Sequence, residues 1–234
     1  MKKSGGYRKL NTLTYASIIQ LATWRFCSQF LNRRNDPCGR QFDQMTQAAR
    51  SGRANIVEGS ERAGTSNTTE MQLTDVARAS LGELQGDYEF WLSNQKKLPW
   101  STNSPEFLEL KSVLLDANPL QPADDLHKAS EYLFSQQEKF KRWLESDDAD
   151  VIANAMIVLL QRTSGMLKKQ LAAQEEDFLQ KGGFRERMNS ARLDERDCGK
   201  PMRRCTAKSG QNAGKPFSGC TGFPDCRGIV NIGK

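Results

Sequence analysis

A run of apolar residues spaced three or four apart is the feature that most constrains the fold. Within residues 67–94 it comprises Leu73, Leu81, Leu84, Tyr88 and Trp91. This spacing places all of them on one face of an α-helix of about five turns. Because a helix with one apolar face must bury that face, the run predicts a helix packed within a bundle.

The same spacing recurs along most of the chain. It predicts further long helices over residues 10–31, 40–61, 123–144 and 149–180, and a short helix over 106–115 inside a proline-containing connection at about 97–122. We therefore expect an all-α domain over residues 1–181, built as an antiparallel four-helix bundle.

Several residues carry more detailed expectations. Leu21 and Trp24 fall on the apolar face of the first helix, so both are predicted to be buried. Gly52 lies inside the second helix, where it is expected to let a neighbouring helix approach closely. Ser66 or Asn67 is expected to cap the third helix.

Residues 182–234 differ from the bundle in charge and in cysteine content. The formal net charge of +6 belongs entirely to this segment, since acidic and basic residues balance over residues 1–181. Four of the six cysteines also lie here: Cys198, Cys205, Cys220 and Cys226. A basic segment favours a polyanionic partner, and clustered cysteines in a reducing compartment favour a metal over disulfides.

Hydropathy and the first residues bear on localisation. No apolar run approaches the roughly 20 residues that a membrane helix needs. The charged start has no apolar segment behind it, so a secretory signal is not expected. We expect a cytoplasmic protein with no membrane partner.

Arrangements that support catalysis are scarce. His127 is the only histidine, which removes most nucleophile–base pairs and histidine metal sites. Residues 59–64 begin and end with glycine but contain no lysine, so they do not match a phosphate-binding loop. We expect the chain not to be an enzyme.

Two segments of the predicted bundle resemble a known family. Residues 44–60, with Asn55 and Glu58, and residues 73–84 are similar to the second- and third-helix motifs of a four-helix bundle family. That family includes proteins encoded by intervening sequences of bacterial 23S ribosomal RNA genes and the accessory variability determinant of diversity-generating retroelements. The resemblance implies a homo-oligomer, a small ring of bundles, without catalytic activity. Through the retroelement relatives it implies a basic surface that binds nucleic acid and a reverse transcriptase.

The basic tail resembles a second family. Residues 199–202, 208–217 and 219–227 are similar to the zinc ribbons at the C-termini of bacterial type I topoisomerases. The resemblance implies a small β module over residues 194–234, joined to the bundle by a linker at 182–193. It also implies one structural Zn²⁺ held between two knuckles.

Cys220 and Cys226 match the second knuckle of such a ribbon. The first knuckle departs from the family pattern, because Glu195 stands where its first cysteine is expected and only Cys198 matches. Cys205 could complete an all-cysteine site, Glu195 could bind through oxygen, or the site could have decayed to a ribbon without metal. A module this small rarely folds without a metal or a disulfide, which favours zinc.

Candidate nucleic-acid contacts lie mainly in the tail. In the tail they are the basic residues Arg203, Arg204, Lys208, Lys215 and Arg227, together with Phe217. In the bundle they are Arg50 and Arg53. The basic side chains can neutralise phosphates, and Phe217 and Phe223 can stack on bases. Alternatively, the phenylalanines form the core of the ribbon, and the bundle arginines pair with Glu58 or Glu61 on a solvated helix face.

Two hypotheses for the function follow. In the first, the chain is a non-catalytic accessory protein whose bundle oligomerises and recruits partners, while the zinc ribbon contacts the backbone of DNA or RNA. In the second, it is a protein-interaction scaffold for a reverse transcriptase or another element-encoded enzyme, and it does not bind nucleic acid itself.

Overall fold

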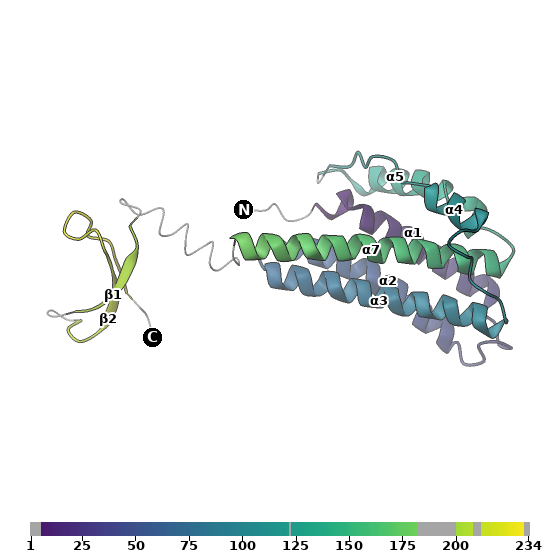
Figure 1. Cartoon of the computed structure of the whole chain (residues 1–234), viewed down its shortest axis with the longest axis horizontal. Coiled ribbons are helices and arrows are strands. Elements are labelled where there is room, and N and C mark those ends of the chain that lie inside the picture. The colour runs from purple at the N-terminus through teal and green to yellow at the C-terminus, as the bar shows by residue number, and fades with distance from the viewer. Residues whose placement is uncertain (1–5, 122, 182–199, 208–211, 232–234) are drawn as a thin grey trace. The chain divides into compact units, whose positions relative to one another are not determined.

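The computed structural model describes residues 6–121, 123–181, 200–207 and 212–231. The chain divides into two compact units, residues 1–180 and 181–234. The described residues of the first unit are mainly helical, and those of the second form short β-strands (Figure 1).

Four long helices form the body of the first unit. They are α1 (Asn11–Phe30), α2 (Arg40–Arg62), α3 (Asn67–Asn94) and α7 (Ala149–Lys181). Two side-chain contacts show how α1 and α2 run relative to each other. Arg53 donates a hydrogen bond to Ser17, and Cys27 lies beside Met45. Helices α1 and α2 therefore run antiparallel.

Helices α3 and α7 continue the antiparallel arrangement. Gln41, near the start of α2, bonds to Asp87, near the end of α3 (3.0 Å). Gln174, near the end of α7, bonds to Glu70, near the start of α3 (3.0 Å). The prediction of an antiparallel helical bundle followed by a small β module is confirmed.

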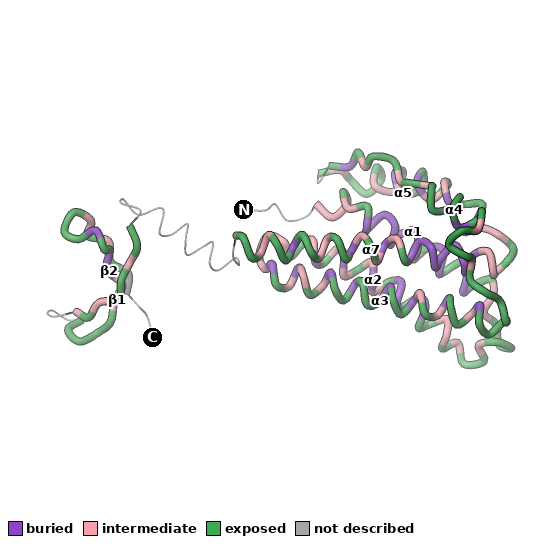
Figure 2. The backbone as a smooth tube through the Cα atoms, viewed as in Figure 1, coloured by how far each residue is buried: buried purple, intermediate pink, exposed green. Residues whose placement is uncertain are grey.

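The core of the bundle is apolar and draws on all four long helices. Its largest fully buried side chains include Phe26, Met45, Tyr88 and Met156. Figure 2 shows the buried positions recurring along each of these helices, with exposed positions between them. The Tyr88 hydroxyl lies within this core and donates a hydrogen bond to Thr23 Oγ1 (3.1 Å), so the buried polar group is satisfied.

The predicted burial of Leu21 and Trp24 is wrong. Their side chains are 43% and 59% exposed. The apolar stripe of α1 is wider than the sector that the neighbouring helices cover. Trp24 instead packs edge-on against Phe42 at the rim of the α1–α2 contact, with ring centroids 5.4 Å apart.

Three shorter helices connect α3 to α7: α4 (Pro105–Ser112), α5 (Leu126–Glu138) and α6 (Lys141–Leu144). The helix predicted over residues 123–144 is thus two helices, because the chain turns at Phe140, whose side chain is fully buried. Ser104 caps α4 and Asp125 caps α5 through their side-chain oxygens. Ser66 caps α3 in the same way, as predicted.

Gly52 allows α2 and α3 to approach closely, as predicted. A Cβ atom at this position would lie 2.6 Å from Cδ2 and 2.7 Å from Cγ of Leu81, a fully buried side chain. Gly82 on α3 offers a matched control, because a Cβ atom there would meet nothing within 4 Å.

Gly52→Ala is expected to lower the free energy of unfolding by up to about 2 kcal/mol. Overpacking a core costs about 1–3 kcal/mol, and the better helix propensity of alanine offsets about 1 kcal/mol of this. Gly82→Ala has only the propensity effect, so it is expected to raise the free energy of unfolding by about 1 kcal/mol. Urea denaturation measures both changes, and shifts of the same sign would contradict the close approach at Gly52.

The second unit is a small antiparallel sheet. Its strands are β1 (Met202–Thr206), β2 (Pro216–Cys220) and β3 (Ile229–Asn231), in the spatial order β1-β2-β3. Gly214, before β2, has a φ of +82°, a backbone conformation that favours glycine. The predicted linker, residues 182–193, lies outside the described residues.

Candidate functional site

Cys220 and Cys226 occupy one tight turn at the end of β2. The Gly222 N–H donates to Cys220 Sγ (3.3 Å), and the Cys226 N–H donates to the Gly222 carbonyl (3.0 Å). A Cβ atom at Gly228 would lie 3.6 Å from Cys226 Sγ and 3.7 Å from Cys220 Cβ, so both cysteines border the same small space. A backbone N–H aimed at sulfur is a contact that can orient a metal-binding cysteine. The turn fits one half of a zinc site.

Cys205 lies on the other face of the sheet from Cys220. In the β1–β2 register Cys205 is opposite Phe217, and Cys220 is opposite Met202. Residues directly opposite share a face and successive residues alternate, so residues 202 and 205 face opposite ways. In the part of the chain that the structure describes, no three His, Cys, Asp or Glu residues lie close enough to hold a metal ion. The register therefore favours another ligand over Cys205, although Cys205, Cys220 and Cys226 all line one hollow of the module.

The remaining predicted ligands, Cys198 and Glu195, lie outside the described residues. Without Cys205 an all-cysteine site lacks a fourth sulfur within the module, because Cys27 and Cys38 belong to the bundle unit. An oxygen ligand such as Glu195 is then the alternative that zinc chemistry allows.

One hollow of about 300 Å³ in the module is bordered by aromatic and basic side chains and also by the three described cysteines of the module, Cys205, Cys220 and Cys226. Phe217 is half-buried in it, whereas Phe223 and Ile229 are 72% and 64% exposed. Arg203 and Arg227, both exposed, also line the hollow. An apolar surface flanked by two guanidinium groups can accept an unstacked base together with its phosphates.

Phe217 and Ile229 show how the sheet builds this hollow. Phe217 is partly buried by its own module and partly open to the hollow. It can therefore serve both as a core residue and as a stacking surface, the two interpretations that the sequence allowed. Ile229 was missed by the sequence analysis, because only the pairing of Ile229 with Gly219 brings β3 to this place. The spacing of residues along the sequence does not predict that pairing.

Two other predicted nucleic-acid contacts of the module, Arg204 and Lys215, are not among the described residues that line the hollow. Arg204 follows Arg203 on β1, so the two side chains project from opposite faces. Lys215 is exposed in the loop before β2, where its Nζ lies 3.4 Å from Asn212 Oδ1. Lys208 lies outside the described residues.

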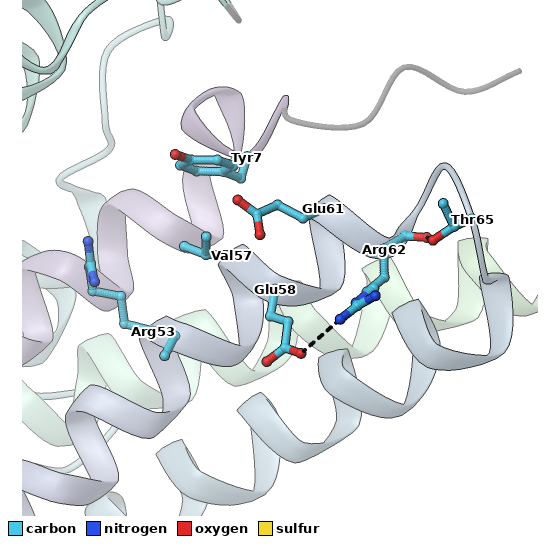
Figure 3. Close-up of a pocket in the computed structure, with 8 residues that line it drawn as sticks. Tyr7, Arg53, Val57, Glu58, Glu61, Arg62 and Thr65 are labelled. Atoms are coloured by element: carbon cyan, nitrogen blue, oxygen red, sulfur yellow. Dashed lines mark hydrogen bonds and ion pairs between the residues drawn. The ribbon is translucent and has the colours of Figure 1, made fainter.

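Arg50 and Arg53 lie one turn apart on α2 but differ in environment. Arg50 is exposed, whereas Arg53 is half-buried and donates its Nε–H to Ser17 Oγ (3.2 Å). Glu58 pairs with Arg62 instead (4.0 Å), and Figure 3 shows Arg53 standing apart from this pair. Among the described residues, neither Arg50 nor Arg53 forms the ion pair with a glutamate that the sequence also allowed.

A groove of about 780 Å³ between α2 and α3 is acidic. Its lining includes Asp43, Glu83 and Asp87. Burial raises the pKa of Asp87 above its usual range, and the hydrogen bond from Gln41 works in the opposite direction. The groove would repel phosphate and attract a basic group.

Cys27 is buried in the bundle, beside Met45 Sδ (3.9 Å). Burial raises the pKa of its thiol to about 12, and the negative charges of Asp87 and Asp36 act in the same direction. The thiol is therefore protonated at neutral pH, where only a thiolate would react or bind metal.

Comparisons with family models, curated proteins and solved structures found no match for this chain. No helix among the described residues is both long and apolar enough to cross a membrane. The two family resemblances therefore stay predictions that rest on the residues themselves.

Proposed function

We propose that the chain is a non-catalytic accessory protein whose β module binds single-stranded nucleic acid. The hollow that Phe217, Phe223 and Ile229 share with two arginines carries this proposal. Stacking on an aromatic ring requires a base that is outside a duplex, and phosphate contacts carry no sequence information. The binding is therefore expected to favour single strands of DNA or RNA with little sequence preference.

Zinc is proposed to hold the module together. Cys220 and Cys226 supply the knuckle whose geometry fits a metal, and Cys198 and Glu195 are the proposed partners from the preceding segment. A closed site of this kind contributes folding free energy and no reaction chemistry.

The bundle is proposed to form a homo-oligomer and to recruit a protein partner in the cytoplasm. One exposed face of α3 can receive a second copy, because Val76 and Phe90 are 47% and 62% exposed. Light scattering of the full chain tests the oligomer.

The second candidate function is a scaffold that recruits a reverse transcriptase or another element-encoded enzyme without binding nucleic acid. The acidic groove of α2 and α3 favours it, because this surface would repel phosphate and attract a basic protein segment.

Arg203→Gln and Arg204→Gln form a matched test of nucleic-acid binding, since the residues are adjacent but face opposite sides of β1. Arg203→Gln and Phe223→Ala are expected to weaken binding of a short fluorescent single strand, the latter by roughly 5- to 150-fold, because one stacked base contributes about 1–3 kcal/mol. Arg204→Gln is expected to change the affinity by less than about twofold. Fluorescence anisotropy at salt concentrations between about 50 and 200 mM measures all three.

The salt series separates the two candidate functions. Affinity that falls steeply with salt, and that depends on Arg203 and Phe223, supports the nucleic-acid proposal. Equal loss in the Arg203 and Arg204 variants would contradict a role for the hollow. Absence of binding at the lowest salt would favour the scaffold.

A further inference from the structure

A cavity of about 190 Å³, partly open to solvent, lies in the helical unit between α1, α2, α5 and the short 3-10 helix η1 (Tyr7–Lys9). Polar and apolar side chains line it, and its apolar part includes Leu13, Leu120 and Tyr132, which are buried, and Ala129 and Leu133, which are half-buried. The volume corresponds to about six water-sized groups at roughly 30 Å³ each. It is large enough for a short organic chain.

Arg53 brings a positive charge to this cavity. Among the described residues, one of its five N–H groups has a hydrogen-bond partner, since Nε–H donates to Ser17 Oγ (3.2 Å). In the part of the chain that the structure describes, no carboxylate lies within ion-pair distance of this guanidinium, since Glu58 pairs with Arg62. Two N–H groups on one edge of a guanidinium match the two oxygens of a carboxylate.

Several other polar groups of the cavity have partners in the protein. Ser17 Oγ donates to the Leu13 carbonyl (2.8 Å), and Ser130 Oγ donates to the Leu126 carbonyl (2.9 Å). The Tyr132 hydroxyl donates to the Asp116 carbonyl (3.0 Å). Arg8, at the rim, donates to the Asp124 carbonyl. Arg53 therefore brings N–H donors and a positive charge to the apolar wall, and Arg8 adds a second positive charge at the rim.

An open groove of about 660 Å³ adjoins the cavity and shares Tyr7 and Arg53 with it. In Figure 3, Tyr7 from η1 and Arg53 from α2 stand on either side of Val57, and Glu61 extends toward the tyrosine ring. The shared residues place the guanidinium where the groove meets the cavity. A ligand can enter with its charged end at Arg53 and its apolar end inside.

We propose that this cavity binds a small monoanion with a short unbranched apolar chain, a carboxylate of about six carbons. The carboxylate pairs with the Arg53 guanidinium, and the chain lies against the apolar walls contributed by α1 and α5. This proposal is independent of nucleic-acid binding by the β module, because its residues belong to the other unit of the chain.

Calorimetric titration of the full chain with hexanoate tests the proposal. Binding is expected to saturate and to tighten about fourfold per methylene from butanoate to hexanoate, as for burial of an apolar chain. Arg53→Gln keeps an N–H donor but removes the charge, and is expected to weaken hexanoate binding roughly tenfold or more. Arg50→Gln, one turn away and exposed, is the matched control and is expected to leave the affinity unchanged.

Two further titrations complete the test. Ala129→Leu, which fills the cavity without changing charge, is expected to abolish hexanoate binding. Its fold is checked by circular dichroism, and Arg53→Gln decides the outcome should Ala129→Leu fail to fold. Hexanol, with the chain but no charge, is expected to bind at least tenfold more weakly than hexanoate.

Several results would overturn the proposal: no saturable binding, an affinity independent of chain length, or equal loss in the Arg50 and Arg53 variants. Loss of nucleic-acid binding in Arg53→Gln, without any effect of hexanoate, would also overturn it. That outcome would assign Arg53 to a phosphate-binding surface.

Discussion

Replacing Cys226 by serine is expected to abolish zinc binding and to unfold the β module. Structural zinc contributes about 10–16 kcal/mol of apparent binding free energy in small zinc domains, and this is folding free energy. A sheet of three short strands cannot supply that much from its own apolar contacts. Cys226 borders the same space as Cys220, so its loss removes half of the knuckle.

Zinc content per chain, measured by mass spectrometry, checks this prediction together with amide exchange of residues 200–231. The purified wild-type chain is expected to carry one zinc. A chelator is expected to abolish the protection of the module's amides from hydrogen exchange and to leave the protection of the bundle's amides unchanged. Absence of zinc in the wild type would indicate a ribbon that has lost its metal.

Two further variants identify the ligands. Cys205→Ser is the matched control, because Cys205 lies on the opposite face of the sheet, and it is expected to keep one zinc per chain. Glu195→Gln is expected to weaken zinc binding, since an amide oxygen is a poorer zinc ligand than a carboxylate. Zinc lost in Cys205→Ser would contradict the ligand set proposed above.

The helices could be predicted because their signals are local. The apolar spacing around Leu84 and the cap at Ser66 depend only on near neighbours in the sequence. The exposure of Leu21 and Trp24 could not be predicted, because the covered sector of an apolar stripe depends on where the other helices cross it. The break at Phe140 has the same origin, since tertiary packing of that ring decides where α5 ends.

Parts of the candidate site could be predicted from the sequence and other parts could not, again because only some of its contacts are local. The turn between Cys220 and Cys226 is local, so its glycines and spacing could be read from the sequence. The face on which Cys205 lies depends on the β1–β2 register, and a shift of one residue would reverse it. The contact of Arg53 with Ser17 joins positions 36 residues apart, which helical spacing cannot pair.

The stability of the connection between α3 and α7 is expected to depend on Arg162 of α7. Its Nη1 donates to the Val113 carbonyl (2.6 Å) and the Tyr15 hydroxyl (3.0 Å), and its Nη2 donates to the Lys111 carbonyl (2.5 Å). These carbonyls lie at the C-terminal end of α4, where a helix leaves acceptors unpaired and carries partial negative charge. Arg162 thus joins α4 to α7 and to α1.

Arg162→Met is expected to lower the free energy of unfolding by about 2–4 kcal/mol, because hydrogen bonds to a charged group contribute about 1.5–3 kcal/mol and the carbonyls lose their partner. The free energy of unfolding of Arg162→Lys is expected to lie between those of the wild type and Arg162→Met. An ammonium group keeps the charge but cannot bridge several acceptors in a plane. Arg142→Met is the matched control. Arg142 binds Glu109 of α4 at the surface, so its loss is expected to cost about 0–1 kcal/mol.

Urea denaturation gives these differences, and amide exchange shows where they act. In Arg162→Met, protection is expected to fall in α4 while α2 and α3 keep theirs, because the latter pack through Gly52 and Leu81 without contact from Arg162. Uniform loss of protection would mean that Arg162 supports the whole core, and no loss would mean that other contacts, such as the buried Phe107 and Leu110, are enough to hold α4. A selective loss would show that one guanidinium, by satisfying the end of a short helix, positions a connection that the apolar pattern leaves undefined.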